Sequence, residues 1–234
     1  MLSRSRLMRL EPGAEVSTHV DFNYHWHNRV RIHIPIITDP RVTFNCGPES
    51  IHMGQGECWI FDSWRRHSVV NGGSEPRVHL VIDTCGSSSF WEMVAGIESL
   101  SFEEVSGKAT FYEFDPARIV ELKTEKYSSS KVMSPGECEY LVEDLIADFV
   151  ANDENTPELV SRYIRLLRGF HQDWRVHWMQ YGEEKEHLHR YQSLIETVRS
   201  QLDPDMRAVV TGSNKIGVNP IFVQRVLRAA IAPL

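Results

Sequence analysis

The sequence predicts an α+β fold, in which an N-terminal sandwich or jelly-roll barrel of short strands precedes a mostly α-helical region. Three observations carry this prediction. Short segments with a period of two recur through the first 86 residues. Turn sequences rich in glycine, proline and asparagine separate them. After residue 136, apolar residues recur instead at helical spacing.

The strand predictions rest on three segments. Val30–Ile36 alternates apolar and polar residues, as in a half-buried strand, and Glu57–Asp62 and Arg77–Asp83 are rich in aromatic and β-branched residues. Asp39-Pro40 and Asn71-Gly72-Gly73 are among the turn sequences between them. Short strands at regular spacing are typical of a sandwich or a jelly roll.

The pattern changes after Asp83 and gives the predicted organisation: residues 1–86 as the β core, 87–136 as a connecting segment and 137–234 as the helical region. Within the connecting segment we expect a short helix over residues 90–100. Residues 109–122 are ambiguous, and the polar, Ser-rich stretch 126–136 is typical of a linker.

Helices are predicted at four places in the C-terminal region. Residues 137–152 place four apolar side chains on one face: Tyr140, Leu141, Leu145 and Phe149. Thr156-Pro157 begins the next helix, with threonine as N-cap and proline at the first helical position. Residues 184–202 and 220–231 have the pattern of two more helices.

Composition narrows the class of protein. Hydrophobic residues make up 41% of the 234 residues, enough for a core, and no run of 18 apolar residues would span a membrane. The N-terminus lacks the apolar stretch of a signal peptide, so we expect a cytoplasmic protein. A net charge of −7 argues against a nucleic-acid partner. The four cysteines have no CxxC spacing and are expected to be reduced and mostly buried.

The most informative motif is His19-Val20-Asp21 with a later His67. Side chains alternate along a strand, so His19 and Asp21 share one face and reach one metal ion. Two imidazoles and one carboxylate are the facial set that suits Fe(II) and leaves coordination positions open. His25-Trp26-His27 is an alternative ligand pair with His67, ranked lower because it lacks the carboxylate.

Three further polar residues are candidates for lining a ligand pocket. Arg77 opens a predicted strand, and its guanidinium suits a carboxylate. Arg31 and His33 share one face of Val30–Ile36, where polar residues indicate a pocket lining; the alternative is a solvent-exposed face. His79 is expected to be a structural or surface residue, and Tyr24, Trp26, Trp64 and Arg65 are candidates for a substrate pocket.

Six stretches resemble the aspartyl/asparaginyl β-hydroxylase family: Leu7–Gly13, His19–Asp21, Arg29–Pro35, Gly56–Asp62, His67–Asn71 and Arg77–Asp83. Bacterial free-proline hydroxylases of the same superfamily share the pattern Ile51-His52-Met53, Gly-Glu-x-Trp and His-Ser-x-Val-Asn. The animal peptide hydroxylases carry glycine where Asp21 stands, so this chain resembles the bacterial branch.

The resemblance implies a double-stranded β-helix (cupin-like) core and an Fe(II)- and 2-oxoglutarate-dependent dioxygenase. It implies that His19, Asp21 and His67 bind iron and act as the catalytic centre. Arg77 would hold the distal carboxylate of 2-oxoglutarate, with His33 assisting and Arg31 nearby. The expected reaction hydroxylates an unactivated C–H bond of an amino acid, of an Asp or Asn side chain in a peptide, or of a related small molecule.

Alternatives remain open at this point. Family members carry a segment ahead of the Leu7–Gly13 strand, which here begins almost at Met1. The sequence is therefore compatible with a piece of a longer protein or with a minimal barrel whose open edge favours a homodimer. A cupin-type ligand sensor and a metal-free interaction module are the competing functions. The helical region is a candidate lid, dimerisation platform or recognition element.

Overall fold

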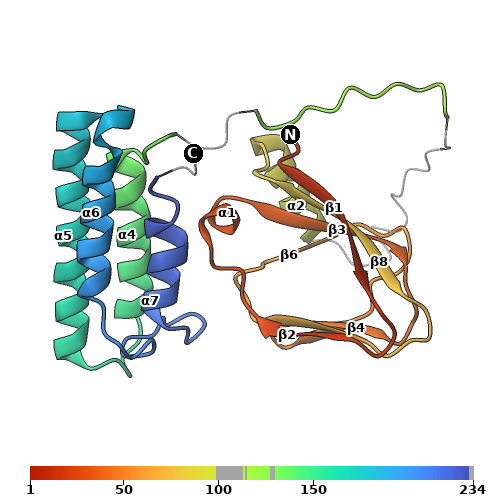
Figure 1. Ribbon diagram of the computed structural model, residues 1–234. Coiled ribbons are helices and arrows are strands. Elements are labelled where there is room, and N and C mark those ends of the chain that lie inside the picture. Colours follow the sequence, from red (N-terminus) through yellow and green to blue (C-terminus); the bar gives the residue numbers. More distant parts are fainter. Residues whose placement is uncertain (99–112, 114, 127–129, 232–234) are drawn as a thin grey trace. The chain divides into compact units, whose positions relative to one another are not determined.

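The structure is a computed structural model that describes residues 1–98, 113, 115–126 and 130–231 (Figure 1). Its contacts divide the chain into two compact units. The β unit comprises Met1–Thr18, Arg29–Ser63 and His67–Lys126. The helical unit comprises Tyr127–Leu234 together with two short segments from the first third of the chain, His19–Asn28 and Trp64–Arg66. Each unit is described below by itself.

Two four-stranded sheets form the β unit, with strand orders β1-β8-β3-β6 and β2-β7-β4-β5 (Figure 1). The strands are β1 (Arg4–Leu10), β2 (Glu15–His19), β3 (Val30–Ile37), β4 (Val42–Cys46), β5 (Glu49–Ile51), β6 (Trp59–Phe61), β7 (His67–Asn71) and β8 (Arg77–Thr84). The chain crosses repeatedly from one sheet to the other, as in a jelly roll. This topology confirms the predicted β-barrel followed by helices.

The interior of the β unit is unusually polar. Its apolar core cluster has four buried side chains, those of Val42, Phe44, Met53 and Val69, with partly buried apolar neighbours packed against them. Every second residue of β3 is buried, namely Arg31, His33 and Pro35. By contrast, Ile36 is 41% exposed. The prediction that the polar face of this strand lines an interior is therefore confirmed, and the solvent-exposed alternative is wrong.

The segment after the barrel is only partly described. Helix α2 spans Ser88–Glu98, close to the predicted helix over residues 90–100, whose last two residues lie outside the described part. Of the ambiguous stretch 109–122, residues 109–112 and 114 also lie outside it. Residues 123–125 lie beside the N-terminus, because the Leu2 amide donates to the Lys123 carbonyl at 2.8 Å.

The helical unit contains α4 (Pro135–Val150), α5 (Pro157–Tyr181) and α6 (Leu188–Ser200), the last preceded by a 3₁₀ turn, η1 (Lys185–His187). Near its end, α7 (Val218–Ile221) continues as a π-helix, η2 (Phe222–Leu227). The helix predicted over 184–202 therefore begins with a 3₁₀ turn. The one predicted over 220–231 ends four residues early, and most of it is π-helical.

Local chemistry explains where these helices begin and end. Ser134 caps α4 by accepting a hydrogen bond from the Glu137 amide, and Pro135 occupies the first turn, so α4 starts inside the predicted linker. Thr156 and Pro157 begin α5, as predicted. Gly182 ends α5 with φ at +53°, a conformation that favours glycine.

The apolar core of the helical unit is much larger than that of the barrel. Helix α4 contributes Cys138, Leu141, Val142, Leu145, Ile146 and Phe149, all buried. Trp174 of α5 is fully buried and donates from Nε1 to the Met133 carbonyl at 2.9 Å. Tyr140, predicted on this apolar face, is 57% exposed, because the buried stripe follows the i, i+3, i+4 spacing that excludes it.

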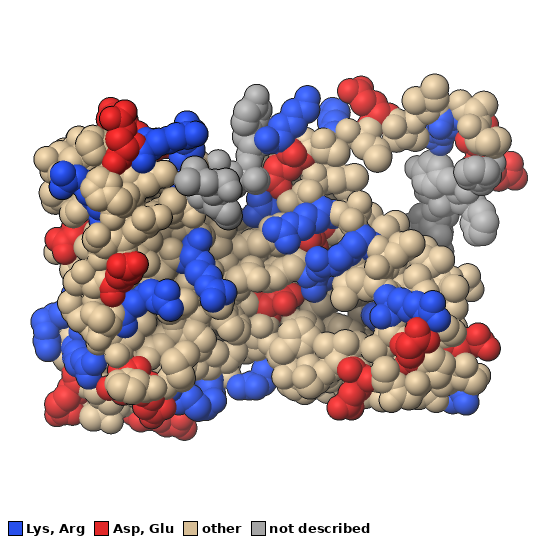
Figure 2. Space-filling model, viewed as in Figure 1, with Lys and Arg blue, Asp and Glu red and all other residues tan. Residues whose placement is uncertain are grey.

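The exposure of the cysteines, the distribution of charge and the character of the helices complete the description. Cys138 is the one fully buried cysteine, whereas Cys58 is exposed and the other two are half-buried, so the expectation that most are buried is wrong. Basic and acidic side chains are interspersed on the face shown in Figure 2. Among the described residues, no helix combines the length and apolar character that a membrane crossing requires.

Candidate metal centre

Two of the three predicted iron ligands lie on neighbouring strands of the second sheet, and the third follows one of these strands. His19 is the last residue of β2 and His67 is the first residue of β7, and these strands are adjacent in the sheet. Asp21 lies two residues beyond His19, just past the end of β2. One donor atom from each of the three residues lies within 4.8 Å of the others.

The three residues fit a divalent transition metal. Donor atoms about 2 Å from one ion lie roughly 3–4 Å apart, so small side-chain adjustments complete the coordination. His67 is 4% exposed, which keeps one ligand away from bulk water. Among the described residues this is the one group of three or more histidine, cysteine or acidic side chains with such spacing, and His25 and His27 are not part of it.

A second polar cluster lies inside the barrel on the adjacent strands β3 and β8. Arg31, His33, Arg77, His79 and Asp83 are all buried. Arg31 pairs with Asp83, its direct neighbour in the register of the two strands, at an Nε–Oδ1 distance of 3.5 Å. The positive charge of Arg31 is therefore compensated within the protein.

Arg77 has a different environment. Its Nη2 donates to Nδ1 of His79 at 3.0 Å, and that ring faces Nδ1 of His33 at 3.3 Å. Burial lowers the pKa of Arg77 to about 10, so the guanidinium remains charged near neutral pH. Burial, reinforced by Arg77, lowers the pKa of His33 to about 2 and that of His79 to about 3. Both imidazoles are therefore neutral.

The charge of Arg77 lacks a compensating anion. Across the described ranges, no carboxylate forms an ion pair with it, and its buried Nε has no hydrogen-bond partner. Nε2 of His33 and of His79 are also buried without partners. Buried charge is costly unless it is paired, so this interior suits an anionic ligand with oxygen acceptors.

The helical unit includes two short segments that contain or adjoin the predicted metal ligands. Residues 19–28 contain helix α1 (Tyr24–His27), and residues 64–66 directly precede His67. Phe22, Tyr24 and Trp64 pack against the helical core. The Tyr24 hydroxyl donates to Glu137 of α4 at 2.5 Å, and Trp64 Nε1 donates to the Ser213 hydroxyl at 3.0 Å.

Arg225 of η2 joins these segments. Its Nε donates to the Phe22 carbonyl at 3.3 Å, its Nη1 to Asp144 of α4 at 3.3 Å, and its guanidinium lies 4.6 Å from the Trp64 ring centroid. The side chain is only 5% exposed, and burial lowers its pKa against the opposing effect of Asp144. The buried Arg225 side chain thus contacts both Phe22, the residue after Asp21, and Trp64, which lies three residues before His67.

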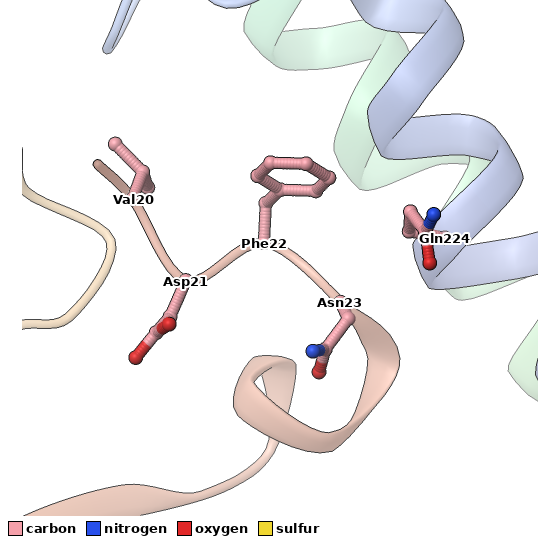
Figure 3. Close-up of a pocket in the computed structure, with 5 residues that line it drawn as sticks. All are labelled: Val20, Asp21, Phe22, Asn23 and Gln224. Carbon is pink, nitrogen blue, oxygen red and sulfur yellow. The ribbon is translucent and has the colours of Figure 1, made fainter.

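A pocket of about 140 Å³ borders Asp21 (Figure 3). Its lining comes from two elements of the helical unit: Val20, Asp21, Phe22 and Asn23 follow strand β2, and Gln224 belongs to η2. The four residues expected from the sequence to line a substrate pocket, Tyr24, Trp26, Trp64 and Arg65, are not among them. Tyr24 and Trp64 instead attach their segments to the helices.

Sequence reasoning missed three residues of this region. The sequence predicts a structural or surface role for His79, yet this residue links Arg77 to His33. The signal that could have found it is its position two residues from Arg77, on the same buried face of β8. Gln224 and Arg225 lie some 200 residues from the histidine–aspartate pair. An ordinary helical pattern surrounds them, so no local signal marks them.

Residues 2–86 match the family described as Aspartyl/Asparaginyl beta-hydroxylase. This segment, which is just over a third of the chain, is similar to that family. The matched residues include the predicted iron ligands and all five members of the buried β3–β8 cluster, and the resemblance drawn from the sequence is thereby confirmed. The match ends just after β8 and leaves the helical unit's main segment outside it.

Among curated proteins, the chain is 29% identical over 79 residues to L-proline cis-4-hydroxylase of Rhizobium meliloti (strain 1021). The match covers 34% of this chain and 28% of that hydroxylase, so the chain spans just over a quarter of its length.

Two solved structures align with about a third of the chain. A predicted oxalate decarboxylase from Thermotoga maritima is 20% identical, with a TM-score of 0.28 over 34% of this chain and 63% of that one. A Cupin 2 conserved barrel domain protein from Salinispora arenicola CNS-205 is 17% identical, with a TM-score of 0.28 over 40% and 70%. The fold assignment rests on the strand order given above.

Proposed function

We propose that this protein is an Fe(II)- and 2-oxoglutarate-dependent dioxygenase. It would hydroxylate an unactivated C–H bond of an amino acid, of an Asp or Asn side chain in a peptide, or of a related small molecule. The observation that carries the proposal is the convergence of His19, Asp21 and His67 in a segment of the β-hydroxylase family. Iron held there would supply the activation of dioxygen that C–H hydroxylation requires.

The remaining roles follow from the chain's own residues. His19, Asp21 and His67 would hold the metal and leave positions open for ligands. Arg77 would bind the distal carboxylate of 2-oxoglutarate, since it is a buried cation without an anionic partner among the described residues. His33, neutral and two residues from Arg31 on the same strand face, would donate to or accept from the same ligand.

The proposal is tested by succinate formation from 2-oxoglutarate in the presence of Fe(II), ascorbate and oxygen. Wild-type protein is expected to release succinate, and His19→Ala and Asp21→Ala are expected to abolish the release. His189→Ala, which removes an exposed histidine of α6, is the matched control and is expected to retain it. Absence of succinate from a wild-type protein that binds Fe(II) with the expected ligands would refute the oxygenase assignment.

Direct metal binding separates the competing functions. Titration with Mn(II) under anaerobic conditions is expected to give one site that Asp21→Ala weakens. A protein that binds no divalent metal would be the metal-free interaction module. One that binds metal and a small ligand without turnover would be the ligand sensor.

A further inference from the structure

The C-terminal π-helix contributes to the pocket beside the metal ligand Asp21. Gln224 is the one pocket residue that the post-β2 segment does not supply, and Figure 3 shows it on η2, facing the Phe22–Asn23 stretch. Short π-helical turns occur frequently at functional sites, where they change the direction of individual side chains. Here the next residue along, Arg225, fixes η2 to the Phe22 carbonyl. The side chain of Gln224 therefore projects from an anchored element.

The amide of Gln224 has a defined orientation. Arg228 Nη1 donates to Gln224 Oε1 at 2.9 Å. Since an arginine has no acceptor, the oxygen of the amide must face Arg228, and the amide nitrogen with its two N–H donors must face the other way. No acceptor in the described part of the chain bonds to that nitrogen. Gln224 thus offers donors, and Arg228 places positive charge behind them.

The size and lining of the pocket limit what it holds. A volume of about 140 Å³ corresponds to roughly five water molecules at about 30 Å³ each. Such a space is large enough for one amino-acid side chain or a small free amino acid. Val20 and Phe22 give it an apolar wall, Asn23 and Gln224 give it amides, and Asp21 gives it a carboxylate. This lining suits a ligand with aliphatic carbons and one oxygen-bearing end.

We propose that Gln224 is a substrate-specificity residue that donates a hydrogen bond to a carboxylate oxygen of a free amino acid bound beside Asp21. The assignment of this ligand as substrate rests on the proposed dioxygenase function. The helical region then acts as a recognition element, because η2 supplies the donor that selects the substrate beside Asp21.

The proposed role of Gln224 is tested by measuring amino-acid binding separately from turnover. Each of the twenty common amino acids is titrated calorimetrically into protein loaded with Mn(II) and 2-oxoglutarate under anaerobic conditions. Wild type is expected to bind at least one of them. Gln224→Ala is expected to weaken that binding about tenfold, and Gln224→Glu more strongly, because a second carboxylate repels the first. Gln192→Ala, an exposed glutamine of α6, is expected to leave it unchanged.

The variants must also keep the rest of the site. Gln224→Ala is expected to retain the wild-type Mn(II) affinity and melting temperature, since the side chain is only half-buried and is not a ligand. Binding of no amino acid by wild type, or equal binding by wild type and Gln224→Ala, would overturn the proposal. Gln224-dependent binding without succinate formation would instead refute the dioxygenase and leave the amino-acid site standing.

Discussion

Acidification from about pH 7.5 to about pH 5.5 is expected to weaken the folded barrel through two buried imidazoles, those of His33 and His79. Burial, together with the charge of Arg77, lowers their folded pKa values from 6.5 to about 2 and about 3. Below pH 6.5 the unfolded chain therefore binds protons that the folded barrel excludes. The two histidines contribute full stability above their unfolded pKa, and this contribution is lost as the pH falls toward their folded values.

The size of the expected loss in unfolding free energy follows from the linkage between proton binding and folding. At about pH 5.5 an unfolded histidine with a pKa of 6.5 is roughly ten parts protonated to one part neutral, whereas both folded imidazoles remain neutral. The free energy of unfolding then falls by about 1.4 kcal/mol for each imidazole, or about 2.7 kcal/mol for both. A loss of this size is a large fraction of the stability of a typical domain.

Amide hydrogen exchange in β3 and β8 is the appropriate assay, because it reports opening of the barrel apart from the helical unit. The protein is kept free of metal with EDTA, so that ligand histidines do not confuse the result, and intrinsic exchange rates are corrected for pH. His33→Gln is expected to remove about half of the pH-dependent loss, whereas the exposed His189→Gln is expected to leave it unchanged. Equal loss in wild type and His33→Gln would refute the reasoning.

Three further outcomes are expected. Trp174→Ala should lower the unfolding free energy of the helical unit by about 3–5 kcal/mol in urea, whereas Met179→Ala, at a side chain 77% exposed, should change it by less than about 0.5 kcal/mol. 2-Oxoglutarate is expected to raise the melting temperature of the wild type, and Arg77→Met should abolish this rise; a retained rise would contradict the proposed role. Arg225→Met should lower Mn(II) affinity roughly tenfold by releasing the segment after Asp21, whereas Arg168→Met, which breaks an exposed ion pair on α5, should not.

Local sequence determined much of the barrel and of the helices. The period-two pattern of Val30–Ile36 and Arg77–Asp83 located β3 and β8, because alternation exposes one face and buries the other. Thr156-Pro157 located the start of α5, because proline fits only where a helix has no amide to satisfy. The spacing of His19 and Asp21 predicted a shared ligand face for the same reason of alternation.

Tertiary structure alone decided which distant residues complete the site. Strands β2 and β7 become neighbours only when the sheets form, so the convergence of His67 with His19 was a hypothesis until then. The neutral pair His33–His79 and the uncompensated charge of Arg77 depend on burial, which no single strand specifies. Gln224 and Arg225 come to the segment after β2 through the packing of a helical core across some 200 residues. The periodicity of a sequence indicates which face of a strand or helix a residue occupies, but not which residues from other elements will contact that face.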